Sequence, residues 1–476
     1  MNLIIKNILI LITTLTFISC GGSSSKDNDT TPVTTATPTE SNNSEPFALV
    51  DSVDITENQY FRVISPKICT QENKNRFIYQ VMHDSYLWAN DVPELDYSDV
   101  QYDTSEKILT ALKNKNDKFS FIIDAQTAQS FFEEGINDDF GMGLTIARLD
   151  STTFVLVITY VYPNSPADKA GLKRGDIIKL VEGKSLTEET FDEIVNILDN
   201  QKMVTFTFLK KDNSNFRKKI TKEPYSIKTV LYYDILVNSE KSKKVGYIVF
   251  QDFIENAIKE LDRVFKTFKE ENVNELVLDL RYNGGGAISV AQHLSSLIGG
   301  TNVAENIFNH TKFNERYSKY NDTRYFEAFT PNALNLNRVF VITTPSTCSS
   351  SELVISALQA SANNIEVIQI GDTTCGKPYG FLGSGTFCNK ALFAINIESQ
   401  NGDGIGNYVN GLTPTCKAED DYSKDFGDTS ESSLSEALNY ILTGKCTVNV
   451  AKQQKIKKRT DLQLPQDGFK RIMSAY

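Results

Sequence analysis

Apolar, strand-like runs alternate with helical segments from about residue 228 onward, and this alternation constrains the fold more than any other feature of the chain. The expected strands are 244–250, 275–280, 338–343, 365–370 and 392–397, and the expected helices are 254–271 and 287–298. Within the run 275–280, Leu276, Val277 and Leu278 are consecutive apolar residues, which indicates a buried strand. Strands and helices in this order predict a layered α/β core.

The whole chain is too long for that core alone, because 476 residues exceed the roughly 100–200 of one domain. A hydrophobic fraction of 40% and a charged fraction of 23% are typical of a soluble globular protein. The formal net charge of −11 argues against a nucleic-acid partner, since phosphate binding needs clustered Lys and Arg. His83, His293 and His310 form no pair at metal-ligand spacing, so we expect no histidine-based metal site.

The first twenty residues predict export. Lys6 precedes an apolar run that ends at Cys20, which is the pattern of a signal peptide over 1–19. Cys20, followed by Gly21-Gly22-Ser23, resembles a bacterial lipobox, in which the signal is removed before the cysteine and the cysteine is acylated. The alternative is an ordinary signal peptide with an accidental cysteine. The six remaining cysteines suggest disulfides in an exported chain.

The segments on either side of the folded part have simpler compositions. Residues 20–50 are rich in Ser, Thr, Pro, Asn and Asp, which predicts a flexible tether after the lipid anchor. Helical patterns indicate a small helical N-terminal domain over 51–135, interrupted at 117–121. We assign 446–476 to a C-terminal tail.

Two glycine-containing motifs mark the segment 136–222. Phe140-Gly141-Met142-Gly143-Leu144 leads into the expected strand 144–148, and A-G-L-K-R-G-D follows at 170–176. Together they resemble a bacterial PDZ domain, whose first motif turns successive backbone N–H groups toward one carboxylate. The adjacent strand would then take a peptide by β-augmentation. The alternative is that Gly141 and Gly143 only make a tight turn into a strand.

A cluster of serines follows the strand 338–343. Ser349, Ser350 and Ser351 precede Glu352 and open a predicted helix at 353–359. A serine at a strand-to-helix corner has an exposed hydroxyl, and the helix dipole favours negative charge developing beside it. The same S-x-x-E pattern is also a capping box, in which Ser349 would only cap the helix.

Two further loops carry candidate groups. Lys377 lies between Gly376 and Pro378 after the strand 365–370, where desolvation would make a lysine available as a general base. A solvated turn is the alternative. The glycines at 284–286 follow the strand 275–280 and can present a backbone N–H to an oxyanion, or serve only close packing.

These loops and the PDZ-like segment resemble the carboxyl-terminal processing (tail-specific) serine peptidases over roughly residues 70–445. The matching motifs are L-D-L-R-x-N-x-G-G at 278–286, S-x-S-x-S-E at 347–352, where Thr347 takes the place of the first serine, and T-x-G-K at 374–377. The resemblance implies an α/β multidomain protein with a layered peptidase core of the crotonase-like, tail-specific protease type over 223–445. It also implies that Ser349 is the nucleophile, that Lys377 is the general base, and that the backbone N–H groups of Ser350 and Gly285 bind the oxyanion.

The chain departs from the family pattern at two places. Cys348 and Cys375 replace the residues usual beside the serine and the lysine, and a Cys348–Cys375 disulfide would pin nucleophile to base. Two separate buried thiols are the alternative. Phe381 stands where many relatives carry a glutamine that orients the lysine, so another group, for example Glu352 or a backbone carbonyl, must hold Lys377. For the other cysteines we expect the pairs Cys388–Cys416 and Cys69–Cys446.

The resemblance implies a serine endopeptidase for exported or misfolded proteins, with PDZ capture of free substrate C-termini and without a metal or organic cofactor. The lipobox further implies that the protein is an outer-membrane lipoprotein of a Gram-negative bacterium, held on the membrane through Cys20. Two alternatives remain open. One is an inactive, PDZ-bearing, peptide-binding scaffold, in which Ser349 is only a cap. The other is a hydrolase with a non-peptide substrate.

Overall fold

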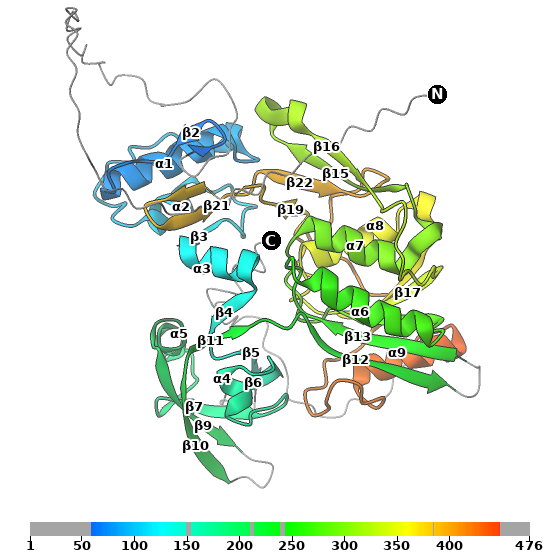
Figure 1. Cartoon of the computed structure of the whole chain (residues 1–476). Coiled ribbons are helices and arrows are strands. Elements are labelled where there is room, and N and C mark those ends of the chain that lie inside the picture. The colour runs from blue at the N-terminus through cyan, green and yellow to red at the C-terminus, as the bar shows by residue number, and fades with distance from the viewer. Residues whose placement is uncertain (1–58, 149–153, 210–213, 239–242, 384, 448–476) are drawn as a thin grey trace, which may run out of the picture. The chain divides into compact units, whose positions relative to one another are not determined.

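The computed structural model describes residues 59–148, 154–209, 214–238, 243–383 and 385–447. Its core sheet has the strand order β12-β13-β14-β17-β18-β23 (Figure 1). These strands are β12 (Val230–Asn238), β13 (Lys243–Phe250), β14 (Glu275–Asp279), β17 (Arg338–Thr343), β18 (Glu366–Gly371) and β23 (Cys416–Lys417). Strands β13 to β23 run parallel, and β12 is antiparallel to β13. The four strands predicted for this sheet, at 244–250, 275–280, 338–343 and 365–370, are confirmed to within one residue at each end.

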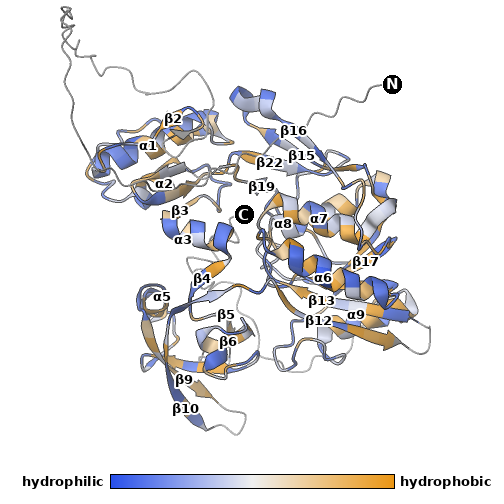
Figure 2. Ribbon diagram, in the orientation of Figure 1, coloured by the Kyte–Doolittle hydropathy of each residue, from blue (hydrophilic) through white to orange (hydrophobic). Residues whose placement is uncertain are grey.

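Helices cover both faces of the core sheet. They are α6 (Ala257–Glu270), α7 (Ile288–Gly299), α8 (Ser350–Leu358) and α9 (Ser432–Thr443). Leu276 and Leu278 of β14 pack in one apolar cluster with α6, α7 and α8, while Val277 between them packs in another cluster with α9. The apolar strands stand between helices with polar outer stripes (Figure 2). The predicted layered α/β fold is therefore confirmed, and it places the ends of β14, β17 and β18 at one edge.

The N-terminal segment contains the predicted helices but is not purely helical. Its helices are α1 (Gln71–Asp84), α2 (Ser105–Leu112) and α3 (Ala125–Gln129), and its strands are β1 (Gln59–Tyr60), β2 (Val63–Ile64) and β3 (Phe121–Asp124). Strand β3 pairs with β21 (Lys390–Phe393), which pairs with β20 (Gly385–Phe387). Residues of α1 and α2 share one apolar cluster with residues 387–395. The N-terminal segment is thus completed by the far end of the chain.

One predicted strand was wrong in extent. The run 392–397 divides between β21 and β22 (Ile397–Gln400), and these belong to different sheets. Strand β22 lies in the sheet β16-β15-β22-β19, formed with β15 (Ile307–Phe313), β16 (Asp322–Tyr325) and β19 (Tyr379–Gly380). The side chain of Asn396, between the two strands, bonds the Leu382 backbone through both its oxygen and its nitrogen, so the ladder is interrupted there.

The segment with the two glycine motifs forms its own sheet, in the order β10-β9-β7-β6-β5. Its elements are β5 (Met142–Arg148), β6 (Phe154–Val161), α4 (Pro166–Lys169), β7 (Ile177–Val181), β8 (Lys184–Ser185), α5 (Phe191–Asn200), β9 (Met203–Leu209) and β10 (Asn215–Thr221). It has an apolar cluster separate from that of the core sheet. Strands β4 (Ile136–Asp139) and β11 (Glu223–Ser226) pair where the chain enters and leaves it.

Three disulfides cross-link the described residues. They join Cys69 to Cys388, Cys348 to Cys375, and Cys416 to Cys446. The expected pairs Cys388–Cys416 and Cys69–Cys446 were therefore wrong. The pairing of β3 with β21 brings Cys388 to the N-terminal segment, and β23 brings Cys416 beside the end of α9. Cys20, the predicted signal peptide, the tether and all but the first two residues of the predicted tail lie outside the described residues.

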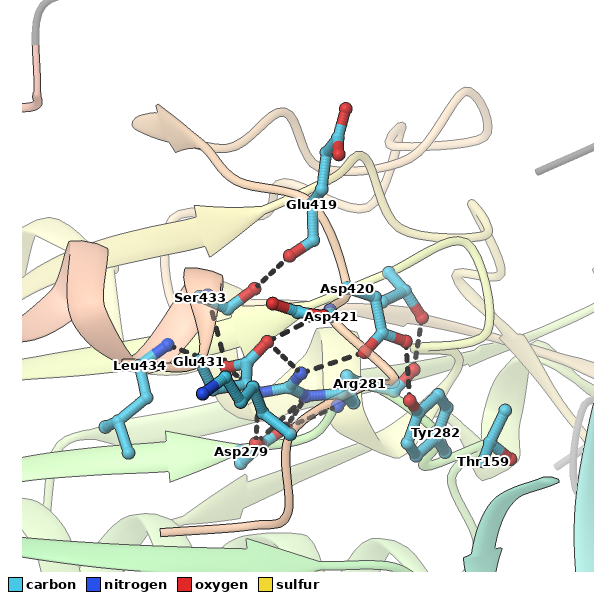
Figure 3. Close-up of polar contacts among 12 residues, drawn as sticks. Thr159, Asp279, Arg281, Tyr282, Glu419, Asp420, Asp421, Glu431, Ser433 and Leu434 are labelled. Atoms are coloured by element: carbon cyan, nitrogen blue, oxygen red, sulfur yellow. Dashed lines mark hydrogen bonds and ion pairs between the residues drawn. The ribbon is translucent and has the colours of Figure 1, made fainter. Parts of the chain in front are cut away.

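A buried ion network ties the core sheet to the segment that follows β23. Arg281, 1% exposed, bonds Asp279, Glu431 and Asp420 (Figure 3). Arg174, from the loop before β7, reaches the same Asp420 and the hydroxyl of Tyr282. Burial alone would raise the pKa of Asp420, but the two arginines lower it to about 2. Each buried charge of the network therefore has partners of opposite charge. Within the described ranges, no helix is both long and apolar enough to cross a membrane.

Candidate active site

Ser349 lies at the turn between β17 and α8 and has an unusual backbone conformation. Its φ is +57° and its ψ is −116°. Few residues other than glycine adopt a positive φ, and such a conformation costs about 1–3 kcal/mol. An ordinary N-cap serine has extended dihedrals instead. Capping alone therefore does not explain Ser349, although Glu352 does accept its backbone N–H at 2.9 Å.

The Glu352 carboxylate joins the turn that contains Ser349 (the serine turn) to the loop 374–377 that ends in Lys377 (the lysine loop). Besides the Ser349 N–H, it accepts the N–H groups of Gly376 and Lys377, both at 2.8 Å, and the hydroxyl of Thr374. Its side chain is fully buried, and burial raises the pKa of Glu352 while these four donors oppose the rise. The Cys348–Cys375 disulfide lies beside it and holds the two loops with their Cα atoms 5.2 Å apart.

Lys377 is 1% exposed, and burial holds the pKa of its ammonium well below the usual range. Among the described residues, its Nζ has no hydrogen-bond partner, so no hydrogen bond joins it to Ser349. Glu352 contacts the Lys377 backbone and not its amine. The expectation that Glu352 or a carbonyl would hold Lys377 is thus met by Glu352 at the backbone, while the amine depends on another contact. Lys377 Nζ instead lies over two aromatic rings. It is 4.6 Å from the ring centroid of Phe381 and 5.3 Å from that of Phe119.

The glycine loop lies beside the serine turn. The carbonyl of Asn283 accepts the N–H of Cys348 and the hydroxyl of Ser351. A Cβ atom on Gly286 would lie 2.2 Å from the Phe253 carbonyl oxygen, so only glycine fits there. The expected oxyanion donor, the Gly285 N–H, bonds the Asn283 side chain at 2.8 Å. It can serve an oxyanion only after that side chain turns away.

The expected carboxylate-binding loop is a tight turn into β5. Gly141 has a φ of +75°, and its N–H bonds the Asp139 carboxylate at 2.6 Å. Phe140, Met142 and Gly143 are buried, while Leu144 is half-buried. Strand β5 is an edge strand of its sheet in the described ranges, as β-augmentation requires.

Sequence reasoning missed the part of the N-terminal segment that reaches this site. Residues 117–121 were predicted only as a break between helices, yet Phe119 contacts Lys377 and the charge of Asp117 acts on it. Nothing in the local pattern could indicate this, because the contact depends on the pairing of β3 with β21.

Three family profiles match the chain. They are Peptidase S41 N-terminal domain over residues 73–121, PDZ domain over 157–210 and Peptidase family S41 over 244–382. The chain carries the domains of the S41 peptidase family. The resemblance predicted from the serine, lysine and glycine motifs is confirmed. The S41 profile includes the serine turn, the lysine loop and the glycine loop.

Known proteins extend this S41 similarity. A Staphylococcus aureus (strain COL) protein named "Probable CtpA-like serine protease" is 27% identical over 228 residues, 47% of this chain and 42% of that protein. A Staphylococcus haemolyticus protein of the same name is 26% identical over 187 residues, 39% of this chain and 36% of that protein. The chain thus aligns with less than half the length of these relatives. A Bacteroides fragilis NCTC 9343 protein assigned to the S41 proteases has a crystal structure similar over 81% of this chain and 98% of that one, with a TM-score of 0.62 and 25% identity.

Proposed function

We propose that the protein is a serine endopeptidase in which Ser349 is the nucleophile and Lys377 the general base. One observation carries the proposal: a single buried carboxylate, Glu352, accepts hydrogen bonds from the backbone of both residues. It thereby fixes a strained serine turn beside a loop with a desolvated lysine. A structural serine needs neither the strain nor the lysine.

The reaction follows from these roles. Neutral Lys377 takes the Ser349 proton, and Ser349 Oγ attacks the substrate carbonyl to give a tetrahedral intermediate. The N–H of Ser350 and, once Asn283 releases it, the N–H of Gly285 bind the oxyanion. Protonated Lys377 then gives its proton to the nitrogen of the scissile bond, the substrate amine leaves, and an acyl-enzyme remains on Ser349. Neutral again, Lys377 takes a proton from the water that hydrolyses this ester and returns it to Ser349 Oγ. Catalytic hydrogen bonds are often long without substrate, so the amine must move toward Ser349 when substrate binds.

The remaining parts of the chain support substrate capture in this proposal. The segment 136–222 takes a substrate's free C-terminus along the open edge of β5. Residues 51–135 and 223–445 form the two parts that meet at Lys377. Residues 1–19 are a signal peptide, Cys20 carries the lipid, 20–50 are the tether and 446–476 are a tail, so that the peptidase is an outer-membrane lipoprotein of a Gram-negative bacterium.

A second candidate is a peptide-binding scaffold without turnover. Two observations favour it: the Lys377 amine makes no hydrogen bond to Ser349, and Asn283 occupies the Gly285 donor. In that case β5 would bind peptides, while the serine turn would keep only a structural role.

Cleavage of an unfolded protein by the purified chain distinguishes the two functions. We expect the wild type to cut, and both Ser349→Ala and Lys377→Ala to lose at least about 10³-fold in rate while remaining folded. Matched controls are Ser356→Ala, further along α8, and Lys417→Ala, exposed on β23, which should cut normally. A folded wild type that cuts nothing but binds peptide C-termini would establish the scaffold instead.

A further inference from the structure

The amine of Lys377 is enclosed by two aromatic rings from distant parts of the chain. Phe381 lies in the loop after β19 and is 8% exposed. It packs edge-on against Phe121 and Phe393, whose own rings stack at 4.7 Å. Phe119 is half-buried, whereas the amine beneath it belongs to a side chain that is almost completely buried. Phe119 therefore separates the lysine from solvent.

A hydrogen-bonded turn over residues 117–120 holds Phe119 against Lys377. The carboxylate of Asp117 accepts the backbone N–H groups of Phe119, at 2.9 Å, and Ser120, at 2.8 Å. Its other oxygen accepts the hydroxyl of Tyr86 at 2.7 Å. These bonds fix the turn that sets the direction of the Phe119 ring.

The same turn is anchored to the segment between β21 and β22. The hydroxyl of Ser120 accepts the backbone N–H of Ile395 at 3.0 Å. From Phe121 onward the chain pairs with β21 in the register Phe121 to Phe393. The position of Phe119 is thus determined by the strands that also hold Phe381 in its aromatic cluster.

We propose that Phe119 and Phe381 are positioning residues for Lys377: the two rings replace a polar partner, hold the amine by contact and exclude water from it. The proposal rests on the function proposed above. It makes the N-terminal segment a part of the active site, since one of the two rings comes from there.

The balance of forces favours a neutral amine. Ring faces attract a cation with about 0.5–2 kcal/mol each. An ammonium buried without hydrogen bonds loses considerably more hydration than that. Among the described residues, the charged groups acting on Lys377 are Asp117 and Glu352, which oppose the effect of burial without cancelling it. A lysine whose amine is neutral can take a proton from serine.

The test is the pH dependence of wild type, Phe119→Ala and Phe119→Tyr. In Phe119→Ala, water reaches the amine, so the acid limb of kcat/KM should move by about one pH unit or more to higher pH. Phe119→Tyr retains the ring and should restore the wild-type limb. Phe313→Ala is the matched control, because Phe313 packs against the same apolar cluster without touching Lys377. It should leave the limb in place.

A second readout does not depend on turnover. Titration of ¹³Cε-labelled lysine by NMR, with the Lys377 signal identified by its loss in Lys377→Ala, follows the amine directly in a Ser349→Ala background. We expect Phe119→Ala to raise the titration midpoint of Lys377. An unchanged midpoint overturns the proposal, whether or not the chain cuts proteins. Should Phe119→Ala fail to fold, Phe119→Leu takes its place with a smaller expected shift in the same direction.

Discussion

Two cysteines adjoin the proposed catalytic pair, Cys348 before Ser349 and Cys375 two residues before Lys377, and they form one disulfide. In Cys348→Ser/Cys375→Ser, both loops lose this cross-link. We expect the free energy of unfolding to fall by about 2–4 kcal/mol. We also expect the cleavage rate to fall by about tenfold to a hundredfold, since misplacing a reacting group by about 1 Å can have that effect. Urea unfolding and the cleavage assay measure the two changes.

The chain offers a matched control for that variant. Cys416 and Cys446 close a loop with a sequence separation of 30, against 27 for the site disulfide. Cys416→Ser/Cys446→Ser should therefore lose similar stability while cutting at the wild-type rate. Equal loss of activity in both variants would show that the site disulfide contributes stability alone.

The candidate residues divide into those that a sequence can show and those that it cannot. Ser349, Lys377 and Glu352 stand in short motifs that each follow a buried strand, so local pattern places them at one sheet edge. Phe119 offers no such pattern, and the motif at 278–286 that contains Asn283 gives no sign that its side chain bonds the Gly285 N–H. The role of Phe119 depends on strand pairing across most of the chain, and the role of Asn283 depends on the direction of its side chain.

At the scale of elements, His293 clamps two helices to the loop after β16. Its Nδ1 lies 2.9 Å from Glu327, and its Nε2 lies 3.3 Å from Asp262 of α6. Burial lowers the pKa of His293, but the two carboxylates outweigh burial and raise it. The clamp therefore stabilises the fold fully below the unfolded histidine pKa of about 6.5, and this stabilisation is lost as pH rises through the folded value.

Replacing that histidine tests the clamp. His293→Gln should lower the free energy of unfolding by about 1 kcal/mol at pH 6 and by less at pH 9, because the wild-type histidine is then neutral. Urea unfolding at both pH values gives the comparison, and an equal loss at pH 6 and pH 9 would contradict a charged clamp.

Element prediction succeeded where periodicity is local. The consecutive apolar residues of β14 and the amphipathic pattern of α6 depend on their own sequence, and both were predicted within a few residues. The run 392–397 has the same apolar character, yet it is divided by Asn396 bonding a distant backbone. Such a division is a tertiary effect, which overrides propensity.

At the scale of the whole molecule, Arg174 links the PDZ segment to the core. Its guanidinium bonds Asp420, the Tyr282 hydroxyl and the backbone carbonyl of Lys424. Arg174→Ala leaves Asp420 with one buried partner fewer, so we expect a loss of about 3–5 kcal/mol in the free energy of unfolding. Arg148→Ala, an exposed arginine of the same segment, should lose almost nothing.

Hydrogen exchange would localise the effect of that change. Amides of residues 418–426 should exchange faster in Arg174→Ala than in wild type, while those of α6 should not. Uniformly faster exchange would mean that Arg174 stabilises the whole fold and not the link between these two segments.

The pairing of β3 with β21 also sets an order in time. A ribosome releases residue 121 long before residue 393, and until then β3, Phe119 and Cys69 have no partners to join. The ring that covers Lys377 consequently reaches its place only when nearly the entire polypeptide exists.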